Sequence, residues 1–348
     1  MTVKAKTQSS ASSQTRILGS RALLLPGLLL CVGVLVAALL WSITLGAADI
    51  TPEVVYEALL NFDADNFDHL IIQTVRLPRV LAGVIVGAAL AVAGAIMQGL
   101  TRNPLADSGI LGINAGAAFA VVLVVYLLDT PSMTVYATAA LIGAALAAGF
   151  VYGIGALGGG ATPLRLTLAG VILTAFVSSL TTAILIQDQE TLDKIRFWTA
   201  GSLAGRDLPI IAQTLPFIAV GLVGALLISR QMTTISLGED VAKGLGQNTV
   251  IIKLIAAALV VLLAGGAVAL AGPIGFVGLV IPHIARFLAG VDYRWIIPYS
   301  AVLGGLLVTL ADVAARVVLR PLELPVGVMM AVVGAPFFIY LARWKVRR

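Results

Sequence analysis

Long apolar stretches without a single charge are the feature that most restricts how this 348-residue chain can fold. Between Arg79 and Arg102 lie 22 uncharged residues, VLAGVIVGAALAVAGAIMQGLT. A helix rises about 1.5 Å per residue, so roughly 20 apolar residues cross a hydrocarbon core about 30 Å thick. The whole chain is 59% hydrophobic and only 11% charged, whereas soluble domains carry about 25% charged residues. The stretch is therefore predicted to be a membrane span.

The same length criterion predicts about ten spans along the chain, so the expected fold class is an all-α polytopic membrane protein. An even number of spans places both termini on one side of the membrane. The first span resembles a cleavable secretion signal, but its apolar core exceeds the about 7–15 residues usual for such signals, so we interpret it as retained. The predicted spans are 22–45, 80–101, 108–128, 134–157, 166–186, 208–228, 254–271, 274–291, 295–311 and 325–342.

The distribution of lysine and arginine predicts the orientation of these spans. With a cytoplasmic N-terminus, 15 of the 22 basic residues fall on the cytoplasmic side, and only four of the 17 acidic residues do. The net charge of +5 therefore reflects membrane topology, and it does not indicate a nucleic-acid partner. Both termini are expected in the cytoplasm.

An internal echo predicts an inverted repeat. Residues 87–94, GAALAVAG, and 265–272, GGAVALAG, share five of eight residues, and Pro104 and Pro282 each follow their block by ten residues. Five crossings separate the two spans, so spans 2–5 and 7–10 would have opposite orientations, as in many transporters. Chance similarity among small residues is the alternative, because glycine and alanine also serve plain helix packing, as in the pair Gly83 and Gly87.

The chemistry expected of an enzyme is missing from the sequence. There is no phosphate-binding GxxxxGK[ST] loop and no HExxH, and the chain has only two histidines and one cysteine. Asp312 has Arg316 one turn later, which favours an ion pair at the end of a span over an ion path. His283 is interpreted as a packed or interfacial histidine rather than a ligand. We therefore expect no catalytic residue, no metal site and no cofactor in this chain, and an energy source in a partner subunit.

The predicted cytoplasmic loop 230–250 has features of a docking segment. Leu237, Val241 and Leu245 recur at four-residue intervals, which predicts an apolar stripe on a short helix, and Glu239 can pair with Lys243. A helix resting on the membrane surface is the alternative to a helix that docks into a groove of a cytoplasmic motor.

Three arginines on the predicted outer side run against the orientation bias and need an explanation. Arg76 and Arg79 flank Pro78 before span 2, and Arg316 follows span 9. They either anchor the helices at the membrane surface or bind carboxylates of an external protein, because a guanidinium group suits that geometry. On the opposite side, Asn103-Pro104 is predicted to end the helix of span 2.

Five ordered motifs make the chain similar to the FecCD family of permeases. They are RLPRVLAGVIVGAALAVAGAIMQGLTRNPLADSGILGINAGA from Arg76, PLRLTLAGV from Pro163, SLGEDVAKGLG from Ser236, AGPIGFVGLVIPHIAR from Ala271 and LELPVGVMMAVVGAPFF from Leu322. The resemblance implies a permease of a binding-protein-dependent ABC importer for ferric siderophores, haem or cobalamin. Residues 1–20 would be a cytoplasmic tail, and 21–348 one transmembrane domain with an external loop at 46–79.

The resemblance also implies an assembly and a location. The permease would pair with a second copy or a paralogue in the bacterial cytoplasmic membrane, in contact with membrane lipid. Two cytoplasmic ATPase subunits, which bind ATP and Mg²⁺, and an external substrate-binding protein would complete the importer.

Carried over by position, the resemblance assigns roles to individual residues. Arg76, Arg79 and Arg316 would dock the binding protein, and Asn103 and Leu105 would form a cytoplasmic gate. A second gate would lie at Thr162 and Pro163, where Pro163 departs from the small hydroxyl residues of the cobalamin permease. The residues expected to contact the ATPase are Leu237, Gly238, Glu239, Val241, Ala242, Leu245 and Gly246.

The sequence leaves a rival class open. A secondary transporter or channel that works alone would also be a polytopic helical protein, and a membrane enzyme is disfavoured by the missing catalytic groups. Within the importer class, a ferric siderophore is the expected cargo, with haem or cobalamin as alternatives.

Overall fold

The structure is a computed structural model that describes residues 21–46, 50–129, 132–157 and 162–345. Helices are the only regular secondary structure of these residues. The predicted polar tail, 1–20, lies outside them. The α-helices are α1 Leu24–Thr44, α2 Pro52–Leu60, α3 Phe67–Ile71, α4 Leu77–Thr101, α5 Ile113–Leu128, α6 Met133–Ala156, α7 Pro163–Gln187, α8 Gln189–Thr199, α9 Leu208–Leu227, α10 Ser229–Leu237, α11 Glu239–Gly244, α12 Thr249–Ala271, α13 Val277–Ala289, α14 Tyr293–Val317 and α15 Val326–Lys345.

Ten apolar helices of the described residues correspond one to one to the ten predicted spans. Seven are long and apolar enough to cross a membrane: α1, α4, α6, α7, α9, α12 and α14. Three apolar helices are shorter, namely α5, α13 and α15. The all-α polytopic fold class is therefore confirmed.

Three of the predicted spans differ from the helices in where they begin or end, because of buried charges or irregular backbone. Span 9 was predicted to end at residue 311, but α14 continues to Val317 because Asp312 and Arg316 neutralise each other inside the protein. Span 3 was predicted from residue 108, but the first residues form a separate 3-10 turn, η3 Ser108–Leu111, before α5 begins. Span 8 was predicted over 18 residues, yet α13 has only 13.

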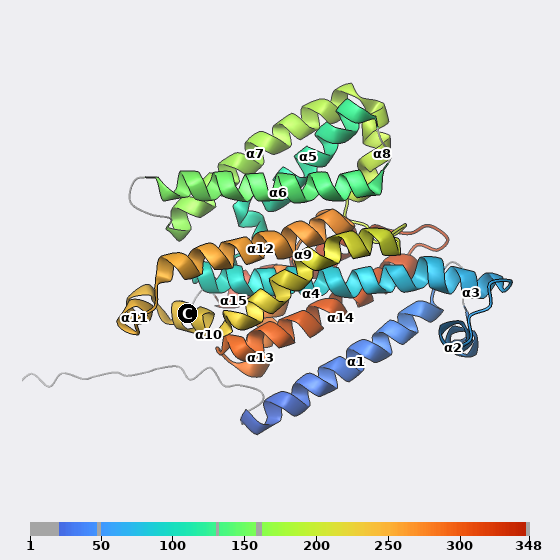
Figure 1. The fold of residues 1–348 in the computed structure, drawn as a ribbon, viewed down its shortest axis with the longest axis horizontal. Coiled ribbons are helices and arrows are strands. Elements are labelled where there is room, and N and C mark those ends of the chain that lie inside the picture. The colour runs from blue at the N-terminus through green and yellow to red at the C-terminus, as the bar shows by residue number, and fades with distance from the viewer. Residues whose placement is uncertain (1–20, 47–49, 130–131, 158–161, 346–348) are drawn as a thin grey trace, which may run out of the picture.

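The ends of the molecule are formed by different short helices (Figure 1). One end carries α10, α11 and the C-terminal end of α15, and we call it the α11 end. The opposite end carries α2, α3 and α8, and we call it the α2 end. Helix α4 runs through the middle between the two ends, with α12 on one side and α13 and α14 on the other, while α9 crosses α4 diagonally and α1 lies at the edge (Figure 1).

The order of long and short helices repeats within the chain. In α4–α7 the helices have 25, 16, 24 and 25 residues, and in α12–α15 they have 23, 13, 25 and 20 residues. The first helix of each set packs on the third helix of the other, α4 on α14 and α12 on α6, and α4 also packs on α12. This exchange of partners is what two related halves of opposite orientation produce.

The two prolines noted beside the repeated sequence blocks do not occupy equivalent places. Pro104 lies in the loop after α4, whereas Pro282 lies inside α13. Their equal spacing in sequence is therefore not part of the structural repeat.

Glycines allow α4 to touch its neighbours through backbone atoms. A Cβ atom on Gly87 would lie 2.2 Å from the Gly304 carbonyl oxygen of α14, and one on Gly94 would lie 2.2 Å from the Gly278 carbonyl oxygen of α13. Lipid gives no hydrophobic drive for helix association, so such close approach supplies the packing energy. The predicted packing role is confirmed for Gly87, while Gly83 faces the side chain of Leu203.

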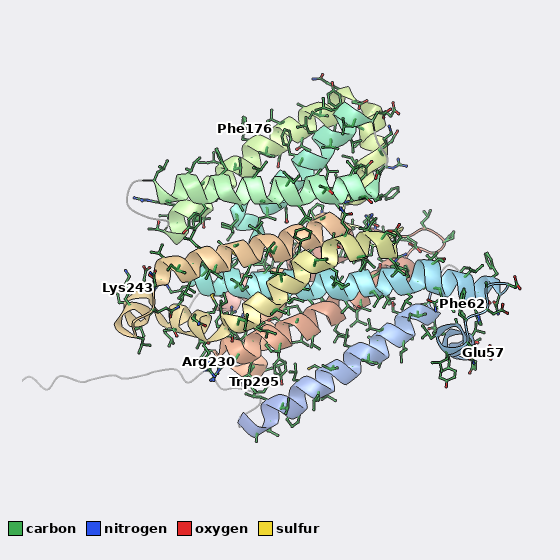
Figure 2. All side chains as sticks on the ribbon, in the orientation of Figure 1. Glu57, Phe62, Phe176, Arg230, Lys243 and Trp295 are labelled. Atoms are coloured by element: carbon green, nitrogen blue, oxygen red, sulfur yellow. The ribbon has the colours of Figure 1, made fainter. Side chains whose placement is uncertain are left out.

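The outer surface has the distribution expected of a membrane protein. Figure 2 shows Arg230 and Lys243 toward the α11 end, Glu57 and Phe62 at the α2 end, and Phe176 on the outward side of α7 between them. Exposed apolar side chains also cover α1 and α6, for example Leu30 and Leu146. These faces lie where lipid would replace water.

Candidate functional site

The arginine cluster, which we define as Arg76, Arg79 and Arg316, lies inside the protein at the α2 end. Arg79 donates from Nε to both carboxylate oxygens of Asp312 at 3.1 Å, and from Nη1 to Glu323 Oε2 at 2.7 Å. Arg316 Nε lies 3.1 Å from Asp312 Oδ2. Asp312 is 3% exposed and is thus a buried carboxylate shared by two guanidinium groups. The predicted ion pair between Asp312 and Arg316 is confirmed, and Arg79 extends it.

The same cluster supplies hydrogen-bond donors to the last turn of α1. The last four carbonyl groups of a helix have no partner within it. In α1, Thr44 Oγ1 donates to the Trp41 carbonyl at 2.8 Å, and Arg316 Nη1 donates to the Ser42 carbonyl at 3.0 Å. Arg76 Nη1 donates to the carbonyls of Ile43 and Thr44 at 2.7 and 2.9 Å. All four carbonyls are therefore satisfied.

Bonding to the end of α1 matches neither of the two explanations in full, which were anchoring at the membrane surface and binding of an external protein. The arginines anchor helices, but through buried contacts with α1 and α14 rather than at the membrane surface. Docking of a binding protein by Arg76, Arg79 and Arg316 stays a prediction. The side chain of Glu323, which is 36% exposed, covers one side of Arg79.

The candidate cytoplasmic gate follows the end of α4. The helix ends at Thr101, and Arg102 takes the left-handed conformation with φ 51°. Asn103 Oδ1 then accepts a hydrogen bond from the Leu105 amide at 3.0 Å, which holds the turn. The prediction that Asn103-Pro104 ends the helix is confirmed. Asn103 is exposed and Leu105 is half-buried.

The second candidate gate lies at the start of α7. Thr162 is the N-cap of this helix, with Oγ1 accepting from the Arg165 amide at 3.4 Å, and Pro163 takes the first helical position, which suits a residue without an amide hydrogen. Helix α7 packs on η3 of the first gate region, where a Cβ on Gly170 would lie 1.7 Å from the Ile110 carbonyl oxygen. The gating roles of Asn103, Leu105, Thr162 and Pro163 stay predictions.

The predicted ATPase-contacting segment forms two short helices at the α11 end. Gly238, with φ 136°, separates α10 from α11, and Gly246, with φ 77°, follows α11. The apolar stripe predicted for one short helix is thus distributed: Leu237 ends α10, Val241 lies on α11, and Leu245 follows it. All three are nevertheless exposed, by 62%, 48% and 72%.

Ion pairs hold α11 against α12 while these apolar side chains face outward. Glu239 pairs with Lys243 at 3.2 Å, as predicted from the sequence, and with Lys253 of α12 at 2.6 Å. The hydrogen bond from Lys253 and the contact with Lys243 lower the pKa of Glu239 to about 2. Ala242 is fully buried beneath the helix. The segment is therefore a fixed projection with an apolar outer face.

His283 is packed as expected. Its ring makes edge contacts with Phe287, at 5.4 Å between centroids, and with Phe337 of α15, at 6.2 Å. In the part of the chain that the structure describes, no group of three or more His, Cys, Asp or Glu residues could hold a metal ion.

The sequence analysis missed a polar cluster at the contact of α4, α13 and α14. Gln98 of α4 bonds with Arg286 of α13, and Tyr293 of α14 bonds with the backbone of α4. The available signal was that Gln98 is the one carboxamide in the uncharged stretch between Arg79 and Arg102.

Ten apolar helices and a repeat of long and short helices in the described residues define a polytopic membrane protein. The family model of the FecCD transport family matches residues 34–344. The chain therefore belongs to the FecCD transport family.

Individual relatives cover nearly the whole chain. The iron(3+)-hydroxamate import permease FhuB of Bacillus subtilis (strain 168) is 48% identical over 94% of this chain and 85% of the relative. The ferric enterobactin transport permease FepD of Escherichia coli (strain K12) is 43% identical over 94% of this chain and 97% of the relative. A solved structure of a metal-chelate type ABC transporter in an inward-facing conformation superimposes with a TM-score of 0.80 at 28% identity, covering 93% of this chain and 99% of that one.

Proposed function

We propose that the chain is the transmembrane permease of an ABC importer that carries a ferric siderophore across the bacterial cytoplasmic membrane. Two permease chains would enclose the pathway, and two ATPase subunits, which bind ATP and Mg²⁺, would drive alternating access. An external binding protein would deliver the cargo. This chain itself would need no cofactor, because it supplies only the pathway and the docking surfaces.

The observation that carries this proposal is the fixed apolar projection formed by α10 and α11. The side chains of Leu237, Val241 and Leu245 are exposed there by 62%, 48% and 72%. Exposed apolar side chains on a rigid short helix fit a groove in a partner protein. A transporter that works alone has no need of such a surface, so the surface favours the ATP-driven class. In this proposal both termini lie in the cytoplasm.

Iron chelates are the proposed cargo because named relatives transport them. FhuB is named for ferric hydroxamate and FepD for ferric enterobactin, whereas a cobalamin permease of Halobacterium salinarum is 36% identical over 83% of this chain. The test is binding of candidate cargoes to the cognate binding protein, with ferrichrome, ferric enterobactin, ferric citrate, haem and cobalamin compared. Tight binding of haem or cobalamin alone would contradict the proposal.

Docking of that binding protein by the arginine cluster is also part of the proposal. Because Glu323 already occupies Arg79, a carboxylate of the binding protein would have to replace it. Glu323→Gln should therefore raise the affinity of the permease complex for the binding protein several-fold, as the neutral amide competes less for Arg79. Unchanged or weaker binding in a pull-down titration would count against docking at Arg79.

A further inference from the structure

Pro282 leaves one carbonyl of α13 without its normal donor. In an α-helix the amide of residue 282 would donate to the carbonyl of residue 278, but proline has no amide hydrogen. The Gly278 carbonyl instead accepts a hydrogen bond at 2.9 Å from Nε2 of Gln98, which belongs to α4. Gln98 is 3% exposed, so water does not compete for this bond. A side chain of one helix thus replaces a backbone donor of another.

The backbones of the two helices touch at the same place. Gly94 lies one turn before Gln98 on α4, and a Cβ there would lie 2.2 Å from the Gly278 carbonyl oxygen. A second, longer contact of 3.5 Å joins Gln98 Nε2 to the Leu279 carbonyl. The carboxamide therefore fixes both the spacing and the register of α4 against α13.

The other half of the Gln98 carboxamide is bonded as well. Arg286 donates from Nη2 to Gln98 Oε1, and it also contacts Tyr293 at the start of α14. The Tyr293 hydroxyl donates to the Ala95 carbonyl of α4 at 3.2 Å. Gln98, Arg286 and Tyr293 thus connect α4, α13 and α14 in one polar network within the apolar interior.

This network reaches α10, the first helix of the ATPase-contacting segment. Thr233 of α10 accepts a hydrogen bond at 2.9 Å from the Tyr293 amide, and Met232 of α10 is fully buried. A Cβ on Gly99 of α4 would lie 2.9 Å from Met232 Cε and 2.5 Å from the Tyr293 hydroxyl oxygen. Helix α10, Tyr293 and the last turns of α4 therefore meet just before the candidate gate at Asn103.

We propose that Gln98 is a positioning residue for transport. By replacing the amide that Pro282 lacks, it makes α4 and α13 move together, and Arg286 and Tyr293 join this pair to α10. A displacement of α10 by the ATPase is then transmitted to the end of α4 that carries Asn103 and Leu105. This inference rests on the proposed function of an ATP-driven importer.

The test is the amount of chelate transported per ATP hydrolysed by the full complex in liposomes. The cargo is whichever of ferrichrome, ferric enterobactin and ferric citrate the wild-type complex takes up most. Gln98→Met keeps the length of the side chain and removes the donors to Gly278. It should lower uptake per ATP about tenfold, because the buried hydrogen bond that joins α4 to α13 is worth about that factor.

A second substitution separates the link between the two helices from the pairing of one carbonyl. Pro282→Ala restores a backbone amide that can donate to the Gly278 carbonyl. Because that bond lies within α13 and does not restore the link to α4, the double variant Gln98→Met with Pro282→Ala should keep the low uptake per ATP of Gln98→Met. If Gln98→Met does not assemble, Gln98→Glu is measured in its place, because the carboxylate keeps an acceptor for Arg286 but lacks the amide donor.

Two matched controls separate positioning from general packing. Gln213→Met removes a glutamine that bonds Thr138 across the contact of α9 and α6 at 2.9 Å, and it should leave uptake per ATP unchanged. Tyr299→Phe removes a buried hydroxyl of α14 that bonds the Leu24 carbonyl of α1 at 2.7 Å, and it should also leave the ratio unchanged. Tyr293→Phe, in contrast, should lower it.

The outcomes are distinct. Equal loss of uptake and ATP hydrolysis in Gln98→Met, or recovery of the ratio in the double variant, would overturn the inference. If the wild-type complex shows no ATP-dependent uptake of any of the three chelates, the proposed function fails, and this inference fails with it. If the wild type is active and Gln98→Met keeps its ratio, only the inference fails.

Discussion

Individual side chains in this protein donate hydrogen bonds to backbone carbonyls that lack a partner within their own helix. Without water, each carbonyl that a helix leaves unpaired needs a donor from elsewhere in the protein. Arg76 and Arg316 serve the end of α1, and Gln98 serves α13 beside Pro282. The buried polar side chains are thus placed where the helical hydrogen-bond pattern is interrupted.

Asp312 is the residue whose loss should cost most stability. Asp312→Asn removes the charge shared by Arg79 and Arg316 and leaves two buried guanidinium groups poorly compensated. Breaking such a buried pair costs about 3–5 kcal/mol. We expect a clearly lower midpoint of thermal unfolding in detergent, with α1 detached first and therefore more accessible to protease.

A surface ion pair is the control for this prediction. Asp193 lies 3.5 Å from Arg196 on α8, and both side chains are more than half exposed. Asp193→Asn should leave the midpoint nearly unchanged, because exposed pairs contribute little. Equal midpoints for the two variants would show that the Asp312 cluster is not a stabilising centre.

The sequence could predict only the local part of this residue chemistry. Asp312 and Arg316 are four residues apart on one helix, so their pairing follows from helical spacing. The contact of Arg79 with Asp312 spans 233 residues, and that of Arg316 with Ser42 spans 274. No local pattern encodes such contacts, because they depend on how helices that are distant in sequence pack together.

At the scale of helices, hydrophobicity predicted the presence of each membrane span better than its first and last residues. All ten spans have a helical counterpart, because uncharged apolar length is a strong signal. The prediction that Leu237, Val241 and Leu245 lie on one short helix was wrong, because Gly238 separates α10 from α11. The length of α13 was overestimated because the apolar residues before Val277 lie in a non-helical segment that ends at Phe276 with φ 69°, and apolarity alone does not distinguish the two.

Helix α11 carries the prediction that belongs to this scale. Val241→Asp places a charge in the middle of the exposed apolar surface and should reduce chelate-stimulated ATP hydrolysis about tenfold or more, because an unpaired carboxylate is costly in a protein interface. The measurement is ATP hydrolysis by the purified complex with loaded binding protein.

Asp240→Asn on the same short helix is the matched control, and it should retain stimulation. Normal stimulation in Val241→Asp would remove the ATPase-contacting role from α11. Loss in both variants, with intact assembly, would instead assign that role to the acidic residues.

At the scale of the whole molecule, helices of the set α4–α7 pack on helices of the set α12–α15, so neither set is a separate unit. Helix α4 packs on α14 and α12 packs on α6. The sequence indicated this repeat through eight residues in each half, but the exchange of partners appears only in three dimensions.

The whole-molecule prediction concerns the energy source. Liposomes that contain this chain alone should not concentrate ferrichrome, ferric enterobactin or ferric citrate, because the buried carboxylate of Asp312 is already paired with Arg79 and Arg316. With the ATPase and the binding protein added, uptake should appear, stop with vanadate and survive an uncoupler. Accumulation by the chain alone, driven by a proton gradient, would establish the secondary-transporter alternative.

The attachment of α1 has a consequence for biogenesis. This helix leaves the ribosome before α14, yet α14 is its main neighbour, and the donors to Leu24 and Ser42 belong to Tyr299 and Arg316. A nascent chain stopped before α14 would therefore hold its first helix loosely in the bilayer. Helix α1 is therefore fixed in its final position only after α14 has been synthesised and inserted.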